Sequence, residues 1–243
     1  MLDRLRQRAE RPELMDDFSR GGTELRVALR HLRRLNRLFG AASPTLYGVR
    51  RLWEEAGRPG RWTLLDIGAG SGDVNRRLLR WADQNRIDLR ITLADRTEEA
   101  CEEARLLFRR EPRVTAIRSD LFALPEACAD VVTGTQFVHH FAASELPRVV
   151  GRMLRSARFG VAINDIHRHW IPWTAVWLAT RIVSGNRYIR NDGPLSVAKG
   201  FRPEDWDELG AELGISGAFY SWRPLFRYAV VIRKNEAGTG KRG

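Results

Sequence analysis

Cysteine is scarce in this sequence of 243 residues. Only Cys101 and Cys128 occur, they form no Cys-x-x-Cys pair, and no group of histidines and cysteines has the spacing of a zinc site. This scarcity argues against a disulfide-stapled fold and favours two free thiols in a reducing compartment. We therefore expect a cytoplasmic protein with no bound metal.

Long hydrophobic runs are also missing. The longest, from Trp170 to Val183, falls short of the roughly 20 residues that a membrane-spanning helix needs. The first twenty residues are charged and lack the apolar centre of a signal peptide. We therefore expect no membrane span and no targeting segment. A hydrophobic content of 43% is enough for the core of one domain with a small accessory piece.

Acidic residues are too few to balance the basic ones. The chain has 30 Asp and Glu against 41 Lys and Arg, which gives a formal net charge of +11. Such a charge attracts RNA or an anionic membrane. The basic residues, however, are almost all arginine and are scattered over the whole chain. Composition bias and solvated helix faces account for most of this pattern, so we expect no nucleic-acid partner.

The stretch from Leu64 to Val74 organises the rest of the chain. An apolar run ends at Asp66, Gly68, Gly70 and Gly72 follow at a spacing of two, and an amphipathic segment begins at once. This pattern predicts a strand, a tight turn and a helix start, the first βα unit of a nucleotide-binding sheet. Amides at the helix start favour an anionic group. A tight turn in some other α/β protein is the alternative.

Acids also follow the next two predicted strands. Asp95 ends the strand 89–95, at a distance from the glycines where an acid in nucleotide folds accepts hydrogen bonds from ribose hydroxyls. Asp120 and Leu121 follow the strand 113–118. Because the carboxyl ends of parallel strands meet at one edge of the sheet, these acids are expected on the same side as the glycine turn.

The form Asp-x-Gly-x-Gly-x-Gly resembles the first motif of the class I S-adenosylmethionine (SAM)-dependent methyltransferases. In that family an acid after the third strand binds the adenine amino group beside an apolar residue, and Asp120 and Leu121 match these positions. The resemblance implies an α/β, Rossmann-like fold with a seven-stranded, mostly parallel sheet, helices on both faces and SAM as cofactor. The cofactor-binding residues that it implies are Asp66, Gly68, Ala69, Gly70, Gly72, Asp95, Arg96, Asp120, Leu121 and Gln136.

The segments around this unit differ in character. Residues 1–60 are helical in pattern, with an apolar face from Leu25 to Phe39. The resemblance implies that these helices form a lid over the ligand pocket, and a simple packing helix is the alternative. We expect the methyltransferase domain over 61–235, with a substrate-side insertion at 165–200. The polar, glycine-rich residues 236–243 are expected to be a disordered tail.

Four of the five histidines follow the predicted strands four and five. A hydroxyl acceptor must lose its proton during methyl transfer, and a neutral imidazole within reach contributes about 10²–10⁴-fold as general base. His167 is the first candidate for this base because Asp165 could orient it, His139 and His140 come next, and His169 follows. Expected substrate contacts are His140, His169, Trp173 and Arg190. A structural role for each histidine stays open.

Sequence motifs also bear on the acceptor. The sequence has no Asn/Asp-Pro-Pro-aromatic motif, which argues against methylation of the exocyclic amines of nucleic-acid bases. It also has no Pro-Cys nucleophile, which argues against methylation at cytosine C5. Three stretches, Glu13–Asp17 with the helix after it, Asn164–His169 and Arg190–Phe201, resemble a bacterial subgroup of small-molecule methyltransferases related to the ubiquinone and menaquinone type. This resemblance implies O-methylation of a phenol, quinol or polyketide hydroxyl in secondary metabolism, by a monomer or homodimer. An RNA methyltransferase and a catalytically silent SAM-binding protein are the alternatives.

Tryptophan recurs at positions 170, 173 and 177, the spacing of one helix face. Three interpretations account for this face. It packs in the core, it forms an aromatic wall against the substrate, or it lies at a membrane surface, where tryptophan and arginine suit the headgroup boundary.

Overall fold

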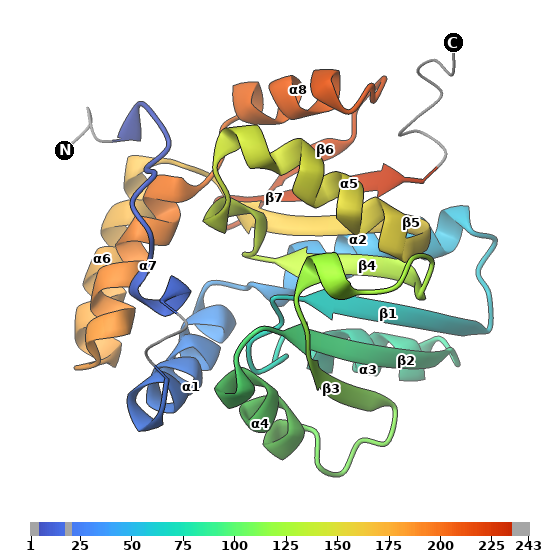
Figure 1. The fold of residues 1–243 in the computed structure, drawn as a ribbon, viewed down its shortest axis with the longest axis horizontal. Helices are drawn as coiled ribbons and strands as arrows, with labels where there is room; N and C mark the ends of the chain where they lie inside the picture. Colours follow the sequence, from blue (N-terminus) through green and yellow to red (C-terminus); the bar gives the residue numbers. More distant parts are fainter. Residues whose placement is uncertain (1–4, 18–20, 235–243) are drawn as a thin grey trace.

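The computed structural model describes residues 5–17 and 21–234, so the tail expected at 236–243 lies outside the described residues. A seven-stranded sheet in the order β3-β2-β1-β4-β5-β7-β6 runs through its centre (Figure 1). The strands are β1 (Arg61–Ile67), β2 (Asp88–Asp95), β3 (Val114–Arg118), β4 (Ala129–Thr135), β5 (Ala157–Ile166), β6 (Tyr220–Arg223) and β7 (Arg227–Arg233). The first five are parallel, whereas β7 is antiparallel to β5 and β6. The predicted Rossmann-like fold is confirmed.

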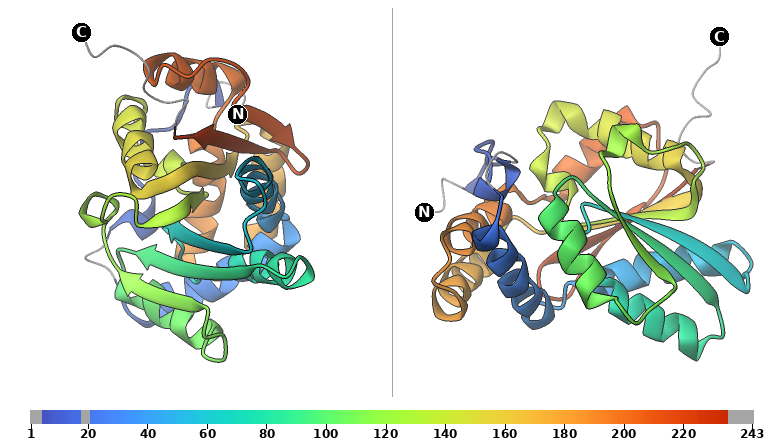
Figure 2. Two further views of the ribbon diagram at one scale, coloured as in Figure 1. Left: turned by 90° about the vertical axis from the view of Figure 1, so that its right-hand side faces the viewer. Right: turned by 60° about the horizontal axis from the view of Figure 1, so that its bottom comes forward.

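Helices cover both faces of the sheet (Figure 2). The α-helices are α1 (Thr23–Leu38), α2 (Ala42–Glu55), α3 (Asn75–Gln84), α4 (Glu98–Leu107), α5 (Leu146–Ser156), α6 (Trp170–Val183), α7 (Arg187–Lys199) and α8 (Pro203–Glu212). Short 3-10 turns are η2 (Leu14–Asp16), η3 (Leu121–Ala123), η4 (Val138–His140) and η5 (Ala143–Glu145). None of the helices in the described part has the length and apolar character to cross a membrane.

Two hydrophobic cores flank the sheet, one on each face. One joins α5 and α8 to the sheet through side chains such as Val150, Met153 and Trp206. The other joins α2 and α3 to the opposite face through Leu52, Leu78 and Leu89. The inner strands are buried on both faces, which explains why their sequences are almost continuously apolar rather than alternating.

The segment 187–199 differs from expectation. The sequence from Tyr188 to Pro194 predicts a loop, but the structure has the continuous helix α7 there. Packing against α6 explains the difference. A Cβ at Gly193 would lie 2.7 Å from Thr180 Cγ2, so the missing side chain lets the two helices approach closely. Tertiary packing overrides the local turn preference of this segment.

The N-terminal segment lies across the carboxyl ends of the strands, beside α7 (Figure 1). Asp192 of α7 accepts hydrogen bonds from the amides of Leu14 and Met15, at 2.8 and 3.0 Å. Glu103 of α4 accepts hydrogen bonds from Arg30 and Arg33 of α1. These contacts fix η2 and α1 over the edge of the sheet where ligands bind in open α/β folds.

Candidate functional site

A cavity of about 490 Å³ lies at the carboxyl ends of β1, β2 and β4. This volume is in the range of small-molecule sites. Its walls come from the turn after β1, the ends of β2 and β4, the loop after β3, and η2, α1 and α7. We call the part beside the turn after β1 the glycine end, and the part beside η2 and η4 the histidine end.

The glycine end depends on the lack of side chains at two positions. Gly68 has a φ of 61°, and a Cβ there would lie 2.3 Å from Phe137 Cδ2. Gly72 has a φ of 71°, and its Cβ would lie 2.4 Å from Leu93 Cδ1. Residues other than glycine rarely adopt such backbone conformations, so both positions require glycine for the turn to close onto its neighbours.

Asp66, before the turn, is fully enclosed. Its carboxylate accepts hydrogen bonds from Asn75 Nδ2 at 2.6 Å and from Thr133 Oγ1 at 2.8 Å. Burial raises the pKa of Asp66 to about 6, although these two hydrogen bonds act to lower it. The carboxylate therefore ties the end of β1 to β4 and to the start of α3, and it lies at the cavity wall.

The carboxylates of Asp95 and Asp120 line the same end. Asp95 accepts hydrogen bonds from the amides of Gly70 and Thr97, at 2.9 and 3.0 Å. Asp120 accepts one from the Phe122 amide at 2.8 Å, and its second oxygen lies 3.2 Å from Arg96 Nε. Backbone donors thus hold both carboxylates in place, where they face the cavity.

A chain of polar side chains extends from α1 into the cavity, and sequence reasoning missed two of its members, Asn36 and Asp73. Asn36 of α1 accepts a hydrogen bond from Gln136 Nε2 at 3.0 Å and donates one to Asp73 at 3.3 Å. Gln136 has a φ of 53°, an uncommon conformation for a residue other than glycine. The arginine- and leucine-rich pattern around Asn36 gives no sign of this contact across 100 residues.

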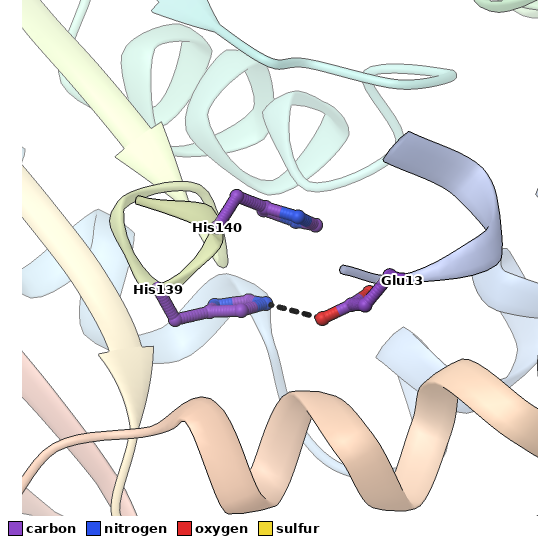
Figure 3. Close-up of side chains that lie close together, drawn as sticks. All are labelled: Glu13, His139 and His140. Carbon is purple, nitrogen blue, oxygen red and sulfur yellow. Dashed lines mark ion pairs between the residues drawn. The ribbon is translucent and has the colours of Figure 1, made fainter. Parts of the chain in front are cut away.

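At the histidine end, His139 lies between two carboxylates, of which Figure 3 shows that of Glu13. Its Nδ1 lies 2.7 Å from Asp165 Oδ1, and its Nε2 lies 3.4 Å from Glu13 Oε1. Burial alone would lower the pKa of this imidazole, but the two carboxylates outweigh burial and raise the pKa of His139 to about 9. His139 is therefore a cation at neutral pH.

His140 stacks on His139, with the ring centroids 4.4 Å apart. Its Nδ1 lies 2.7 Å from Asp16 Oδ1, and its side chain is 28% exposed. Burial acts to raise the pKa of Asp16, but the hydrogen bond and charge of His140 outweigh it and lower that pKa well below its usual range. His140 and Asp16 form an imidazole–carboxylate pair on the cavity wall.

Helix α7 completes the histidine end. Ser196 Oγ donates a hydrogen bond to Glu13 Oε1 at 3.0 Å. The Lys199 ammonium lies 3.4 Å from Asp16 Oδ2 and 3.8 Å from Glu13 Oε1. Since Glu13 and Lys199 are both almost fully enclosed, the charges at this end compensate one another rather than being screened by solvent.

Comparison with known proteins agrees with this geometry. A family model described as a methyltransferase domain matches residues 64–160, from the middle of β1 into β5. None of the curated protein sequences compared with the chain matches it. Residues 64–160 are a methyltransferase domain.

Solved structures share the fold at low identity. A SAM-dependent methyltransferase from Aquifex aeolicus is 18% identical, and the match covers 86% of this chain and 97% of that one with a TM-score of 0.55. Magnesium protoporphyrin IX methyltransferase from Synechocystis with bound SAH is 14% identical over 85% and 94%, with a TM-score of 0.56. An O-methyltransferase family 2 protein from Planctomyces limnophilus in complex with apigenin is 15% identical over 71% and 50%, with a TM-score of 0.52.

Residues 64–160 are thus a methyltransferase domain in a fold shared with SAM-dependent methyltransferases, and S-adenosylmethionine is its cofactor. The glycine end fits this group, since the donor is a cation at its sulfonium and the wall carries the acids Asp66, Asp73, Asp95 and Asp120. Nine of the ten residues expected to bind the cofactor line the methyltransferase cavity. The tenth, Gly72, instead packs against Leu93 behind the turn.

Four residues expected at the methyltransferase's acceptor side lie outside the cavity-lining set. His167 accepts a hydrogen bond from Trp222 Nε1 at 3.2 Å, and Asp165, expected to orient it, pairs with His139 instead.

His169 caps the start of α6 by accepting from the Ile171 amide. Trp173 lies on the half-buried side of α6, and Arg190 donates to the Ser184 carbonyl. Asp165 pairs with His139 because β5 ends beside η4.

The histidine end also has donor atoms that a metal ion could use. One ligand atom each from Glu13, His139 and His140 lies within 4.8 Å of the others. Two imidazoles and a carboxylate are a donor set that transition metals take. Against metal binding, a pKa of about 9 for His139 favours a proton over a metal ion on its ring, and the Lys199 ammonium lies close enough to compensate Glu13 and Asp16. Side chains of the protein itself thus compensate the charges at this end.

Proposed function

We propose that this methyltransferase methylates the hydroxyl of a small acceptor with an apolar body, a phenol, quinol or polyketide. The cavity supports this class because its middle is apolar and its far end carries an imidazole–carboxylate pair. The apolar lining comes from α1, η2 and η4 and comprises Met15, Leu25, Leu29, Leu32, Leu35, Phe137 and Phe141. Bound SAM supplies the electrophilic methyl group.

The observation that carries this proposal is the pair formed by His140 and Asp16. Asp16 next to Nδ1 favours the tautomer with the proton on that nitrogen, which leaves Nε2 as the basic nitrogen. An imidazole held in this way accepts a hydroxyl proton during the transfer. His139 is a poor base, because a group with a pKa of about 9 is protonated at neutral pH. We therefore assign the base to His140 rather than to His167 or His139.

His139 has a positioning role in this scheme. It is clamped between Asp165 and Glu13, and its ring supports the ring of His140. Glu13 belongs to the segment that leads into η2, and η2 also supplies Asp16. This arrangement supports the lid role proposed for residues 1–60, since the base is complete only when η2 lies against η4. The lid also excludes water from the transferring methyl group.

The test is a steady-state assay with methyl-labelled SAM and a panel of phenols and quinols. We expect the variant His140→Ala to lower kcat by about 10²–10⁴-fold at neutral pH, with the dissociation constant for SAM unchanged. The loss is expected to shrink as the pH rises toward the acceptor's own pKa, because a phenolate needs no base. A structural defect would not follow the acceptor pKa.

The matched control is His167→Ala, which also replaces an imidazole after a strand but lies outside the cavity. Its kcat is expected to stay within a factor of about two of the wild type. Equal losses in the two variants would contradict the assignment of the base. Label that appears only in RNA, with none in any phenol or quinol, would contradict the acceptor class.

A further inference from the structure

Exposed apolar side chains gather in two segments away from the cavity. Seven of the ten large apolar side chains that are exposed in the described residues belong to α6 and to the hairpin of β6 and β7. We call these seven the α6 face: Trp170, Ile171, Trp177, Leu178, Ile182, Trp222 and Leu225. Ile182 is the most open, at 76% exposed. Such a concentration marks an interaction surface.

The exposed residues of α6 lie on one side of the helix. They fall at positions 170, 171, 174, 175, 177, 178, 181 and 182, the spacing of one helix face. The opposite side packs against α7, where Val176 and Thr180 meet Gly193. Figure 1 shows α6 at the outer edge of the molecule, beyond α7. Apolar residues therefore lie on both sides of α6, the side packed against α7 and the side exposed to solvent.

Ring contacts join α6 to the hairpin. The His169 ring stacks on Phe226, with centroids 5.3 Å apart, and lies 5.8 Å from Trp170. Phe226 in turn meets Trp222 edge to face at 6.1 Å. His167 accepts the indole hydrogen bond of the same Trp222. His167 and His169 therefore hold the two segments of the α6 face together.

Charge favours one kind of partner for this face. Residues 170–191 and 217–234 contain no aspartate or glutamate. Arg181 lies over the Trp177 ring at 3.8 Å, Arg223 lies over Tyr47, and Arg190 is exposed. Among the described residues, none of these three arginines has an ion pair with an acid. A surface of tryptophan, aliphatic side chains and arginine whose own segments contain no acid matches the headgroup boundary of an anionic bilayer.

We propose that the α6 face binds the surface of anionic membranes, with Trp170, Trp177 and Ile182 in the headgroup boundary. The net charge of +11 adds long-range attraction to such a surface. The contact is peripheral, since α6 has 14 residues. This inference does not depend on the acceptor or on the catalytic base proposed above. In this proposal the exposed tryptophans of α6 and β6 have the same role, contact with the membrane surface.

The test is co-sedimentation of the whole protein with vesicles. One set contains phosphatidylcholine alone, and the other contains phosphatidylcholine mixed with phosphatidylglycerol. We expect binding to the mixed vesicles that weakens with salt, as electrostatic attraction requires. The double variant Leu178→Gln/Ile182→Gln is expected to bind them at least about tenfold more weakly, because two aliphatic side chains no longer enter the boundary. The solution methyltransferase rate of this variant is expected to be unchanged.

The matched control is Leu106→Gln on α4, whose side chain is exposed to a similar degree as Leu178 but lies outside the α6 face. It is expected to bind vesicles like the wild type. The proposal is overturned if wild type binds neither vesicle, or if the double variant binds as the wild type does. It is also overturned if the wild type forms dimers in lipid-free buffer that the double variant does not, since the face would then serve a second copy of the chain.

Discussion

The two ends of the cavity are built in different ways. At the glycine end, the contacts of Asp66 with Thr133 and of Gly70 with Asp95 span 67 and 25 positions. At the histidine end, they join residues from opposite ends of the chain. Ser196 and Glu13, for example, are 183 positions apart. The cofactor side therefore belongs to consecutive βα units, whereas the acceptor side exists only after the N-terminal segment has folded back onto α7.

The two ends also differ in how general their chemistry is among enzymes of this fold. The glycine end holds a cofactor that is common to many enzymes of the fold, and backbone geometry largely determines it. The histidine end depends on buried charges, Glu13, Asp165 and Lys199, that compensate one another. Such networks are sensitive to the loss of one member, because the remaining charges stay enclosed without a partner. The three predictions below test this contrast, from the largest expected effect to the smallest.

The largest effect is expected at Gly68. The variant Gly68→Ala places a Cβ 2.3 Å from Phe137 Cδ2 at a positive φ. We expect it to lower the free energy of unfolding by about 2–4 kcal/mol and to weaken SAM binding at least about tenfold. Urea denaturation and titration calorimetry measure the two effects.

The control for Gly68 is Gly57→Ala. Gly57 also has a positive φ, of 81°, but a Cβ there meets nothing within 4 Å. It is expected to cost only about 1 kcal/mol, with SAM binding unchanged. If both variants lost the same free energy of unfolding, the Phe137 side chain would have moved aside at little cost. The packing of the glycine end would then not require glycine at position 68.

The glycine end could be predicted from the sequence more completely than the histidine end. Nine of the ten predicted cofactor residues line the cavity, because a motif on one strand–turn–helix unit and acids after neighbouring strands are local patterns. Asn36 and Asp73 were missed, since a single polar residue in an amphipathic helix carries no signal of its partner 100 positions away.

The acceptor side could not be predicted in the same way. The loop expected around Gly193-Pro194 is a helix, and the Asp165 carboxylate faces His139 instead of His167. Adjacent side chains on a strand point to opposite faces, so the partner of Asp165 depends on the exact end of β5 and on the path of η4. The pairing of Glu13 and Asp16 with the two histidines becomes apparent only when η2 lies beside η4. Long-range folding determines these pairs.

The second prediction concerns the charge of His139. Its folded-state pKa of about 9 lies above the ordinary value of 6.5. Between these pH values the folded protein binds more protons than the unfolded chain, so stability falls as the pH rises from about 6.5 to about 9. We expect a loss of roughly 2–3 kcal/mol over this range. Urea denaturation at a series of pH values measures it.

The control for this pH dependence is His139→Gln, which keeps a polar side chain but does not titrate. It is expected to be less stable than the wild type at pH 6.5 and to show a flat profile from there to pH 9. A wild-type profile that is flat as well would show that His139 is neutral in the folded protein. In that case His139 would compete with His140 for the role of base.

The smallest effect is expected where α1 is tied to α4. Glu103 is almost fully enclosed and accepts hydrogen bonds from Arg30 at 2.8 Å and from Arg33 at 3.3 Å. The variant Glu103→Gln keeps the shape but removes the charge, and we expect it to lower the free energy of unfolding by about 1–2 kcal/mol. SAM is expected to bind severalfold more weakly, because α1 closes the glycine end through Leu29 and Asn36.

The matched control for Glu103 is Glu98→Gln on the same helix. Glu98 pairs with Arg105 on the protein surface, where solvent screens the interaction, so this variant is expected to unfold and bind SAM like the wild type. If Glu103→Gln destabilised the protein but left SAM binding unchanged, α1 would be a packing helix rather than a lid. The two ends of the cavity would then be independent, because the N-terminal segment would serve the histidine end alone.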